Sequence, residues 1–209
     1  MAACTQAAKK ALRSQLKKQI RSLTLEQKKR ESLEVTQKLL SHKWYQQSCR
    51  IAVYLSMDDE VDTEPIVKHI LASGRDCFVP RYVGDRMDML KLYSLDDLSS
   101  LPLTKWNIKQ PADDDDSRLD AYTAGGLDLV VMPGLGFTIE GDRLGRGKGY
   151  YDSYLSLCES RALMPKSIGL AFSAQMCKSI PMGPTDKKID LVLYPQGTEP
   201  GTIENIKHQ

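Results

Sequence analysis

Leu127-Asp-Leu-Val-Val-Met132, followed by Pro133-Gly-Leu-Gly-Phe137 and Thr138-Ile-Glu-Gly-Asp-Arg-Leu-Gly-Arg-Gly-Lys-Gly-Tyr-Tyr-Asp152, is the stretch that decides the fold. Its first six residues are mostly apolar and β-branched, which predicts a short strand. The glycine-rich continuation predicts a loop, and a helix is expected from Gly149 to Cys158. In open α/β sheets, ligands bind where loops leave the carboxyl ends of strands. The loop therefore stands where a binding site is expected.

Similar strands recur along the chain. Five more short β-rich runs are Arg50–Leu55, Asp76–Pro80, Met87–Tyr93, Ser167–Ala171 and Ile189–Tyr194. A helical stretch at Thr63–Ser73 separates the first two of these runs. Strands that alternate with helices form parallel pairs. We therefore predict a three-layer, Rossmann-like α/β domain with a mainly parallel sheet.

A pair of helices is predicted before the first strand, within residues 1–45. Apolar residues at helical spacing define one face of the first helix, about residues 4–22: Leu12, Leu16, Ile20 and Leu23. Thr24 and Gln27 form a capping-box pattern that opens a second helix, which ends near His42. Its candidates for burial are Leu33, Leu39 and Leu40. Both helices are expected to pack on the α/β domain.

Length and composition limit the class of protein. The 209 residues fit one domain, with residues 196–209 expected to fray as a tail. A net charge of +2 gives no reason to expect nucleic acid as a partner. No apolar stretch approaches the roughly twenty residues that cross a bilayer, and the five cysteines lack metal-site spacing. We expect a cytoplasmic protein without membrane partners, and a monomer by default.

Residues 143–149 form a basic loop that can hold an anion. Its glycines are Gly145, Gly147 and Gly149, and the cations between them are Arg146 and Lys148. Glycines let backbone N–H groups approach an anion, and a helix that starts near Gly149 points its positive dipole end at the same volume. Backbone, side chains and helix dipole together favour polyphosphate.

The basic loop matches no standard nucleotide motif. A Walker A loop needs glycine where Asp142 stands and a hydroxyl residue where Gly149 stands. The dinucleotide fingerprint also fails, because Tyr150 occupies the place of its last glycine. On the residues alone, a flexible basic surface loop stays open as the alternative.

Acidic residues near the loop have two interpretations each. Asp152 is either a carboxylate stabilised by the helix dipole or a ligand for magnesium, and Asp186 can supply a second oxygen. Glu60 follows a strand end and can accept hydrogen bonds from a ligand, whereas its neighbours Asp58 and Asp59 fit a solvated acidic turn. The Asp-rich run at Ala112–Ser117 is expected to be a solvated loop.

The segments Met132-Pro-Gly-Leu-Gly-Phe137 and Gly141-x-Arg-Leu-Gly-Arg-Gly-Lys-Gly-Tyr-Tyr-Asp152 resemble the signature of the 5-formyltetrahydrofolate cyclo-ligase family, and the likeness is close to its animal members. The resemblance covers nearly the whole chain. Other matching segments are Lys9-Lys-Ala-Leu-Arg13, Tyr54-Leu-Ser-Met-Asp-Asp-Glu60, Val79-Pro-Arg-Tyr82, Met87-Asp-Met89, Trp106-Asn107 and Asp190-x-Val192-Leu193.

This resemblance implies an enzyme that uses ATP and magnesium to cyclise 5-formyltetrahydrofolate to 5,10-methenyltetrahydrofolate, releasing ADP and phosphate through a phosphorylated formyl group. Its substrate carries one glutamate or a polyglutamate tail. The implied ATP contacts are Lys9, Lys10, Ala11, Leu12, Arg13, Arg143, Leu144, Gly145, Arg146, Gly147, Lys148, Gly149, Tyr150 and Tyr151. The implied folate contacts are Arg13, Leu55, Glu60, Trp106, Arg146, Gly147, Lys148, Gly149 and Tyr150. Arg146 and Lys148 would act on the transferring phosphoryl group, and Asp152 and Asp186 would hold magnesium.

Two other classes of function are compatible with the loop itself. One is an isomerase or acyl-transferring enzyme that holds a phosphorylated substrate without hydrolysing ATP. The other is a non-catalytic folate- or nucleotide-binding module. The first acidic residue is Glu26, so the basic N-terminal segment also imitates a mitochondrial transit peptide. The resemblance argues against cleavage there, because it implies that Lys9 and Arg13 work in the enzyme.

Overall fold

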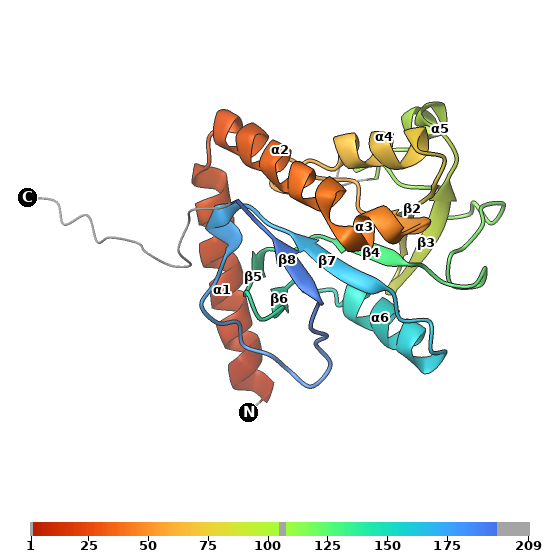
Figure 1. Cartoon of the computed structure of the whole chain (residues 1–209). Coiled ribbons are helices and arrows are strands. Elements are labelled where there is room, and N and C mark those ends of the chain that lie inside the picture. The colour runs from red at the N-terminus through yellow and green to blue at the C-terminus, as the bar shows by residue number, and fades with distance from the viewer. Residues whose placement is uncertain (1, 105–107, 196–209) are drawn as a thin grey trace, which may run out of the picture.

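A six-stranded sheet forms the centre of the molecule (Figure 1). The computed structural model describes residues 2–104 and 108–195, so Trp106 and the tail at 196–209 lie outside the described residues. The strands are β1 (Arg50–Val53), β2 (Asp76–Val83), β3 (Arg86–Leu92), β4 (Leu129–Met132), β7 (Lys166–Leu170) and β8 (Leu191–Leu193). All six coincide with predicted runs. Their order is β3-β2-β1-β4-β7-β8, with every neighbouring pair parallel except β2 and β3.

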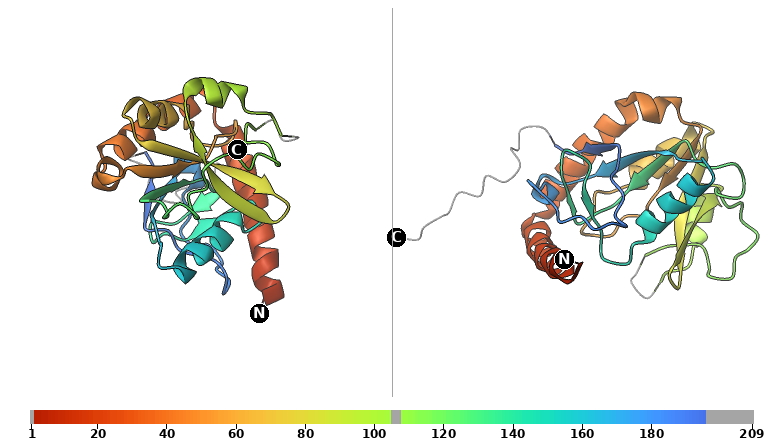
Figure 2. Two further views of the ribbon diagram at one scale, coloured as in Figure 1. Left: turned by 90° about the vertical axis from the view of Figure 1, so that its right-hand side faces the viewer. Right: turned by 90° about the horizontal axis from the view of Figure 1, so that it is seen from below.

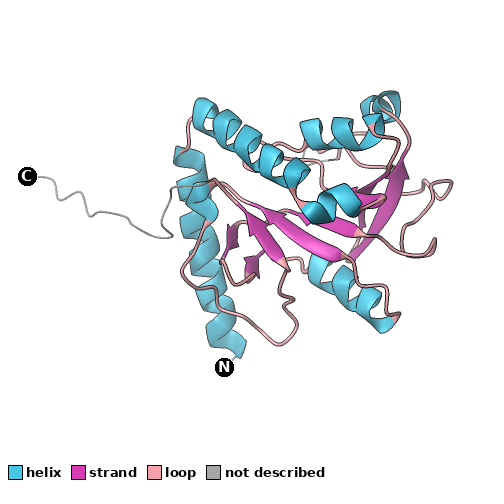
Figure 3. Ribbon diagram, in the orientation of Figure 1, coloured by secondary structure: helices cyan, strands magenta, loops and turns pink. Residues whose placement is uncertain are grey.

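Helices cover both faces of this sheet (Figure 3). They are α1 (Ala2–Ser22), α2 (Leu25–Ser41), α3 (Lys43–Gln47), α4 (Glu64–Ala72), α5 (Leu95–Ser100) and α6 (Tyr150–Ser160), with a 3-10 turn at Ser173–Gln175. The predicted three-layer α/β class is confirmed. Among the described helices, none has the length and apolar character that a bilayer crossing needs.

Alternate residues of each strand serve different layers, as the two-residue period of a strand requires. Ile51 and Val53 join the core beneath α2 and α4, while Ala52 joins the core beneath α6. Figure 2 shows α6 on the face of the sheet opposite α2. Burial on both faces explains why β4 reads as a continuous apolar run, Leu129-Val-Val-Met132, without alternation.

The helical pair before the first strand is confirmed. Thr24 Oγ1 accepts from the Gln27 N–H at 3.1 Å and Gln27 Oε1 accepts from the Thr24 N–H at 2.8 Å, which completes the predicted capping box. Within α2, Leu39 is buried, but Leu33 is 61% exposed, so its predicted burial is wrong. The buried face of α2 contains polar residues such as Glu31 and Ser32, which the apolar pattern does not reveal.

A short hairpin carries the basic loop. β5 (Gly136–Phe137) pairs antiparallel with β6 (Arg143–Leu144), outside the main sheet and beside α1 in Figure 1. Leu16 of α1 packs with Leu144 and Ile180 in a small separate cluster. This apolar contact sets α1 against the hairpin.

Candidate functional site

The candidate site lies where the strand order reverses. The chain fills one side of β1 with β2 and β3, and then crosses to place β4 on the other side. In α/β proteins, ligands bind outside the carboxyl ends of the strands at such a reversal. Glu60 comes from the loop after β1, and Arg146 from the loop between β6 and α6, in the connection that follows β4. The two side chains meet, as described below.

The basic loop ends at the start of α6, as predicted. Gly149 is the N-cap residue of this helix and has φ +71° and ψ +11°. That left-handed conformation is strained for residues with a Cβ, so glycine suits the position. The first N–H groups of α6 are thus left without a capping side chain. Such groups and the helix dipole favour an anion at this end.

Helix α1 places one cation at the basic loop and another at the loop before β8. Arg13 Nε donates to the Gly145 carbonyl at 2.9 Å, and the Lys9 ammonium forms an ion pair with Asp186. Lys9 and Arg13 are one helical turn apart, so both lie on the side of α1 that Leu16 anchors to the hairpin. Lys10 and Ala11 are exposed and Leu12 is partly buried. Of the predicted N-terminal contacts, the structure therefore brings Arg13 to the basic loop and Lys9 to Asp186, in the loop before β8.

Asp152 in α6 and Asp186 in the loop before β8, the two carboxylates predicted to hold magnesium, lie on segments that contact each other. Asp152 Oδ2 accepts from Arg143 Nη2 at 3.0 Å, and Asp152 Oδ1 accepts from the Lys187 N–H at 3.0 Å. Asp186, next to Lys187, also accepts from the Gly183 N–H. Burial acts to raise the pKa of Asp186, but the Lys9 ammonium and the Gly183 N–H outweigh it and hold the pKa below its usual value.

A buried carboxylate faces the other side of the basic loop. The side chain of Glu60 is 6% exposed, and its Oε1 accepts from Nε and Nη2 of Arg146 at 3.3 and 3.1 Å. Burial raises the pKa of Glu60, against the opposing effect of Arg146. Asp59 Oδ1 accepts from the same Nη2 at 2.6 Å. The prediction that Asp59 is merely solvated is therefore wrong, because the fold carries Arg146 to it from a distant part of the chain.

Aromatic residues close the region next to Glu60. The Tyr150 hydroxyl donates to the Gly84 carbonyl at 2.8 Å, and the rings of Tyr82 and Tyr150 have centroids 4.9 Å apart. Tyr151 is buried and lies in the core beneath α6. Leu55 is partly buried against the opposite core. Tyr150 therefore faces the loops around Glu60, whereas the neighbouring Tyr151 is part of the hydrophobic core.

Gln110 supports this aromatic wall and was not found from the sequence. Its Oε1 accepts from the Tyr82 N–H at 3.2 Å, and its Nε2 donates to the Tyr82 carbonyl at 3.4 Å. The amide group of Gln110 thus makes the two main-chain hydrogen bonds with Tyr82 that a neighbouring strand would make. A lone glutamine after a loop carries no sequence signal for such a role.

Of the three cations in the basic loop, Lys148 has the most exposed side chain. Its side chain is 66% exposed, and its Nζ lies 4.0 Å from Asp85, which is itself 99% exposed. A contact between two such exposed groups contributes little to stability. Lys148 is therefore available to a ligand.

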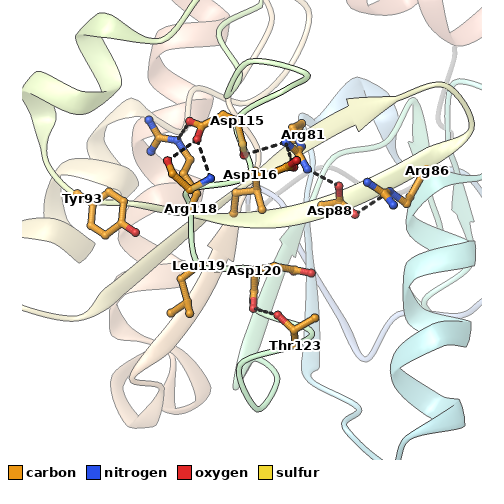
Figure 4. A pocket seen from close by; sticks show the side chains of 12 residues that line it. Arg81, Arg86, Asp88, Tyr93, Asp115, Asp116, Arg118, Leu119, Asp120 and Thr123 are labelled. Atoms are coloured by element: carbon orange, nitrogen blue, oxygen red, sulfur yellow. Dashed lines mark hydrogen bonds and ion pairs between the residues drawn. The ribbon is translucent and has the colours of Figure 1, made fainter.

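A hollow of about 550 Å³ lies away from the basic loop and is lined by residues of β2, β3 and the segment 115–123 (Figure 4). Its cations are neutralised within the protein: Arg81 pairs with Asp88 at 3.0 Å, and Arg118 pairs with Asp115 at 2.7 Å. Burial raises the pKa of Asp120 in its wall. The lining of the hollow contains four aspartates against three arginines, so the basic loop, where Arg13 and the N-terminus of α6 add to the loop's own cations, is the better candidate for a polyphosphate.

The fold and the site define a Rossmann-like α/β protein with a basic, glycine-rich loop and a buried carboxylate at the switch point of its sheet. Within that class, the chain belongs to the 5-formyltetrahydrofolate cyclo-ligase family, whose model matches residues 5–195. The resemblance read from the sequence is confirmed. Membership places the chain among the ligases that act on folates.

Individual relatives agree with this assignment. The 5-formyltetrahydrofolate cyclo-ligase of Mus musculus is 48% identical over 198 residues, which cover 93% of this chain and 97% of the relative. The probable 5-formyltetrahydrofolate cyclo-ligase of Caenorhabditis elegans is 34% identical, with 89% and 92% covered. The NMR structure of 5,10-methenyltetrahydrofolate synthetase from Aquifex aeolicus superposes with a TM-score of 0.72 at 26% identity and covers 96% of this chain and 98% of its own.

Proposed function

We propose that the chain uses ATP and magnesium to convert 5-formyltetrahydrofolate to 5,10-methenyltetrahydrofolate, with release of ADP and phosphate. The observation that carries this proposal is the convergence of Arg13, the basic loop and the N-terminus of α6 at the switch point of the sheet. A polyanion is the ligand that such a concentration of positive groups favours. Glu60 and Tyr150 border the same loop and supply hydrogen-bonding and ring contacts for a folate.

The carboxylates near the loop fit a magnesium–nucleotide complex. Among residues 2–104 and 108–195, no group of three or more His, Cys, Asp or Glu side chains is arranged to hold a metal ion. Mg²⁺ is usually bound by one or two carboxylates together with water and substrate phosphates. Asp152 and Asp186 supply two such carboxylates, and their present partners are cations. A bound magnesium ion would neutralise phosphate charge at these carboxylates.

The reaction needs a leaving group because a formamide oxygen leaves poorly. The formyl oxygen attacks the γ-phosphorus, so an O–P bond forms and the bond to ADP breaks. The neighbouring secondary amine then attacks the formyl carbon and loses its proton to water, and the C–O bond breaks with release of phosphate. Arg146 and Lys148 stabilise the negative charge on the transferring group, a task that suits preorganised cations.

Glu60 and Trp106 are proposed folate contacts. Glu60 would accept hydrogen bonds from the donor edge of the pterin, which its burial strengthens by excluding competing water. Trp106 would stack on a flat ring of the folate. We also propose a monomer in the cytoplasm, with ATP and the folate as its small-molecule partners and with no preference assigned for polyglutamate tails.

One assay tests the proposal. Purified protein is incubated with 5-formyltetrahydrofolate, ATP and Mg²⁺, while methenyl absorbance and ADP are followed together. We expect equal amounts of both products and none without ATP. Absence of methenyl product with any divalent metal would refute the cyclo-ligase reaction. Methenyl product without ADP would refute the phosphorylated intermediate alone.

A further inference from the structure

Arg146 is held on one edge by two carboxylates from the loop after β1. Its Nη2 donates to Asp59 at 2.6 Å and to Glu60 at 3.1 Å, and its Nε donates to Glu60 at 3.3 Å. No described residue accepts a hydrogen bond from Nη1. Because the guanidinium is planar, contacts along one edge determine the direction in which the remaining N–H groups point.

The turn that carries these carboxylates is itself fixed. The Glu60 N–H donates to the Met57 carbonyl at 3.0 Å, and the Met57 N–H donates back to Glu60 Oε2 at 3.1 Å. From α2, Lys28 Nζ donates to the Asp58 carbonyl at 2.9 Å. The turn therefore has partners within itself and on a neighbouring helix. Asp59 is thus held in place to accept from Arg146.

Burial separates this contact from an ordinary surface ion pair. The side chains of Arg146 and Asp59 are 35% and 31% exposed, and that of Glu60 is 6% exposed. Glu60 alone can hold Nε and Nη2, but one carboxylate oxygen shared by two donors allows the guanidinium to rotate about it. The shorter bond from Asp59 stops that rotation. The solvent-facing part of Arg146 is then left for a ligand.

We infer that Asp59 is a positioning residue, which orients Arg146 so that Nη1 meets the transferring phosphoryl group. This inference rests on the proposed function, in which Arg146 stabilises that group. Asp59 does not touch the reacting atoms, and it acts only by accepting from Nη2. A misdirected catalytic group costs turnover more than it costs substrate binding, because the interaction is strongest in the transition state.

The test compares Asp59→Ala with the matched control Asp58→Ala. Asp58 is exposed, and its described contact uses its main-chain carbonyl, which the substitution retains. We expect Asp59→Ala to lower kcat on the order of 10- to 100-fold, with each KM changed less than about 3-fold. Asp59→Asn, which keeps an oxygen acceptor, should recover part of kcat. Asp58→Ala should match the wild type.

A double-mutant cycle tests whether Asp59 acts through Arg146. Lysine lacks the planar fork of arginine, so Asp59→Ala added to Arg146→Lys should change kcat by less than about 2-fold. Equal kcat for Asp59→Ala, Asp58→Ala and wild type would overturn the inference, as would an undiminished effect in the Arg146→Lys background. If thermal unfolding shows that Asp59→Ala does not fold, Asp59→Asn against Asp58→Asn gives the same comparison. Inactive wild-type protein would instead refute the proposed function together with the inference.

Discussion

Replacing Asp186 by asparagine tests the ion pair that joins α1 to the loop before β8. The Lys9 side chain is 8% exposed and that of Asp186 is 17% exposed, so the variant leaves a largely buried ammonium without its carboxylate. A hydrogen bond to a charged group contributes about 1.5 to 3 kcal/mol. Each kcal/mol lowers the melting temperature of a chain this long by about 2 to 4 °C. We therefore expect a decrease of about 3 to 12 °C at pH 7.

The acid dependence of this loss has a defined sign. The folded pKa of Asp186 lies below its ordinary value of 3.8, because Lys9 and Gly183 outweigh the effect of burial. The carboxylate therefore contributes its stability above the unfolded pKa and loses that contribution as the pH falls through the folded pKa. The difference in the free energy of unfolding between wild type and Asp186→Asn should be at its full size near pH 7 and should shrink below about pH 4.

The assay is urea unfolding at several pH values, followed by circular dichroism, with Asp114→Asn as the control because Asp114 is exposed. A second readout is the melting temperature with ATP alone and with ATP and Mg²⁺. We expect the magnesium-dependent part of the stabilisation to vanish in Asp186→Asn. Stability equal to that of Asp114→Asn at pH 7 would refute the ion-pair argument. An undiminished magnesium effect would refute the role of Asp186 toward the metal.

Three further substitutions separate binding from folding. Lys148→Ala should lower turnover on the order of 100-fold while leaving the melting temperature nearly unchanged, because its side chain is 66% exposed; a collapse of stability in thermal unfolding would contradict this. Gly147→Ala places a Cβ 3.5 Å from the Arg13 guanidinium without a clash, but at φ +112°. It should lower stability by about 1 to 2 kcal/mol and weaken ATP binding in calorimetry, and unchanged affinity would count against the loop as the phosphate site. Gln110→Ala removes both hydrogen bonds to the Tyr82 main chain. We expect a loss of about 1 to 3 kcal/mol in urea unfolding and a larger increase in the KM for the folate than in the KM for ATP. Gln110→Glu should be destabilised at least as much, because its buried carboxylate would face the Tyr82 carbonyl and Asp113 Oδ1, to which Nε2 now donates.

Local patterns were sufficient to predict the six strands of the main sheet and the helices α1, α2, α4 and α6. The apolar run ending at Met132, the capping pair Thr24 and Gln27, and the glycine at the start of α6 each depend on neighbours in sequence. Backbone preferences and burial patterns are encoded at that range. The weakest elements escaped prediction. The two-residue strands β5 and β6, for example, are too short to show a repeating pattern, and their hairpin packs against α1.

The basic loop, its glycines and its cations were determined by the sequence, since their chemistry is local. The partners of those cations were decided by tertiary structure. Asp59 lies 87 residues from Arg146, and Lys9 lies 177 residues from Asp186. A charged side chain does not specify its partner, because any carboxylate brought within reach can pair with it. The strand order sets β4 beside β1 and so brings the connection after β4, which carries Arg146, to the loop after β1, which carries Asp59 and Glu60.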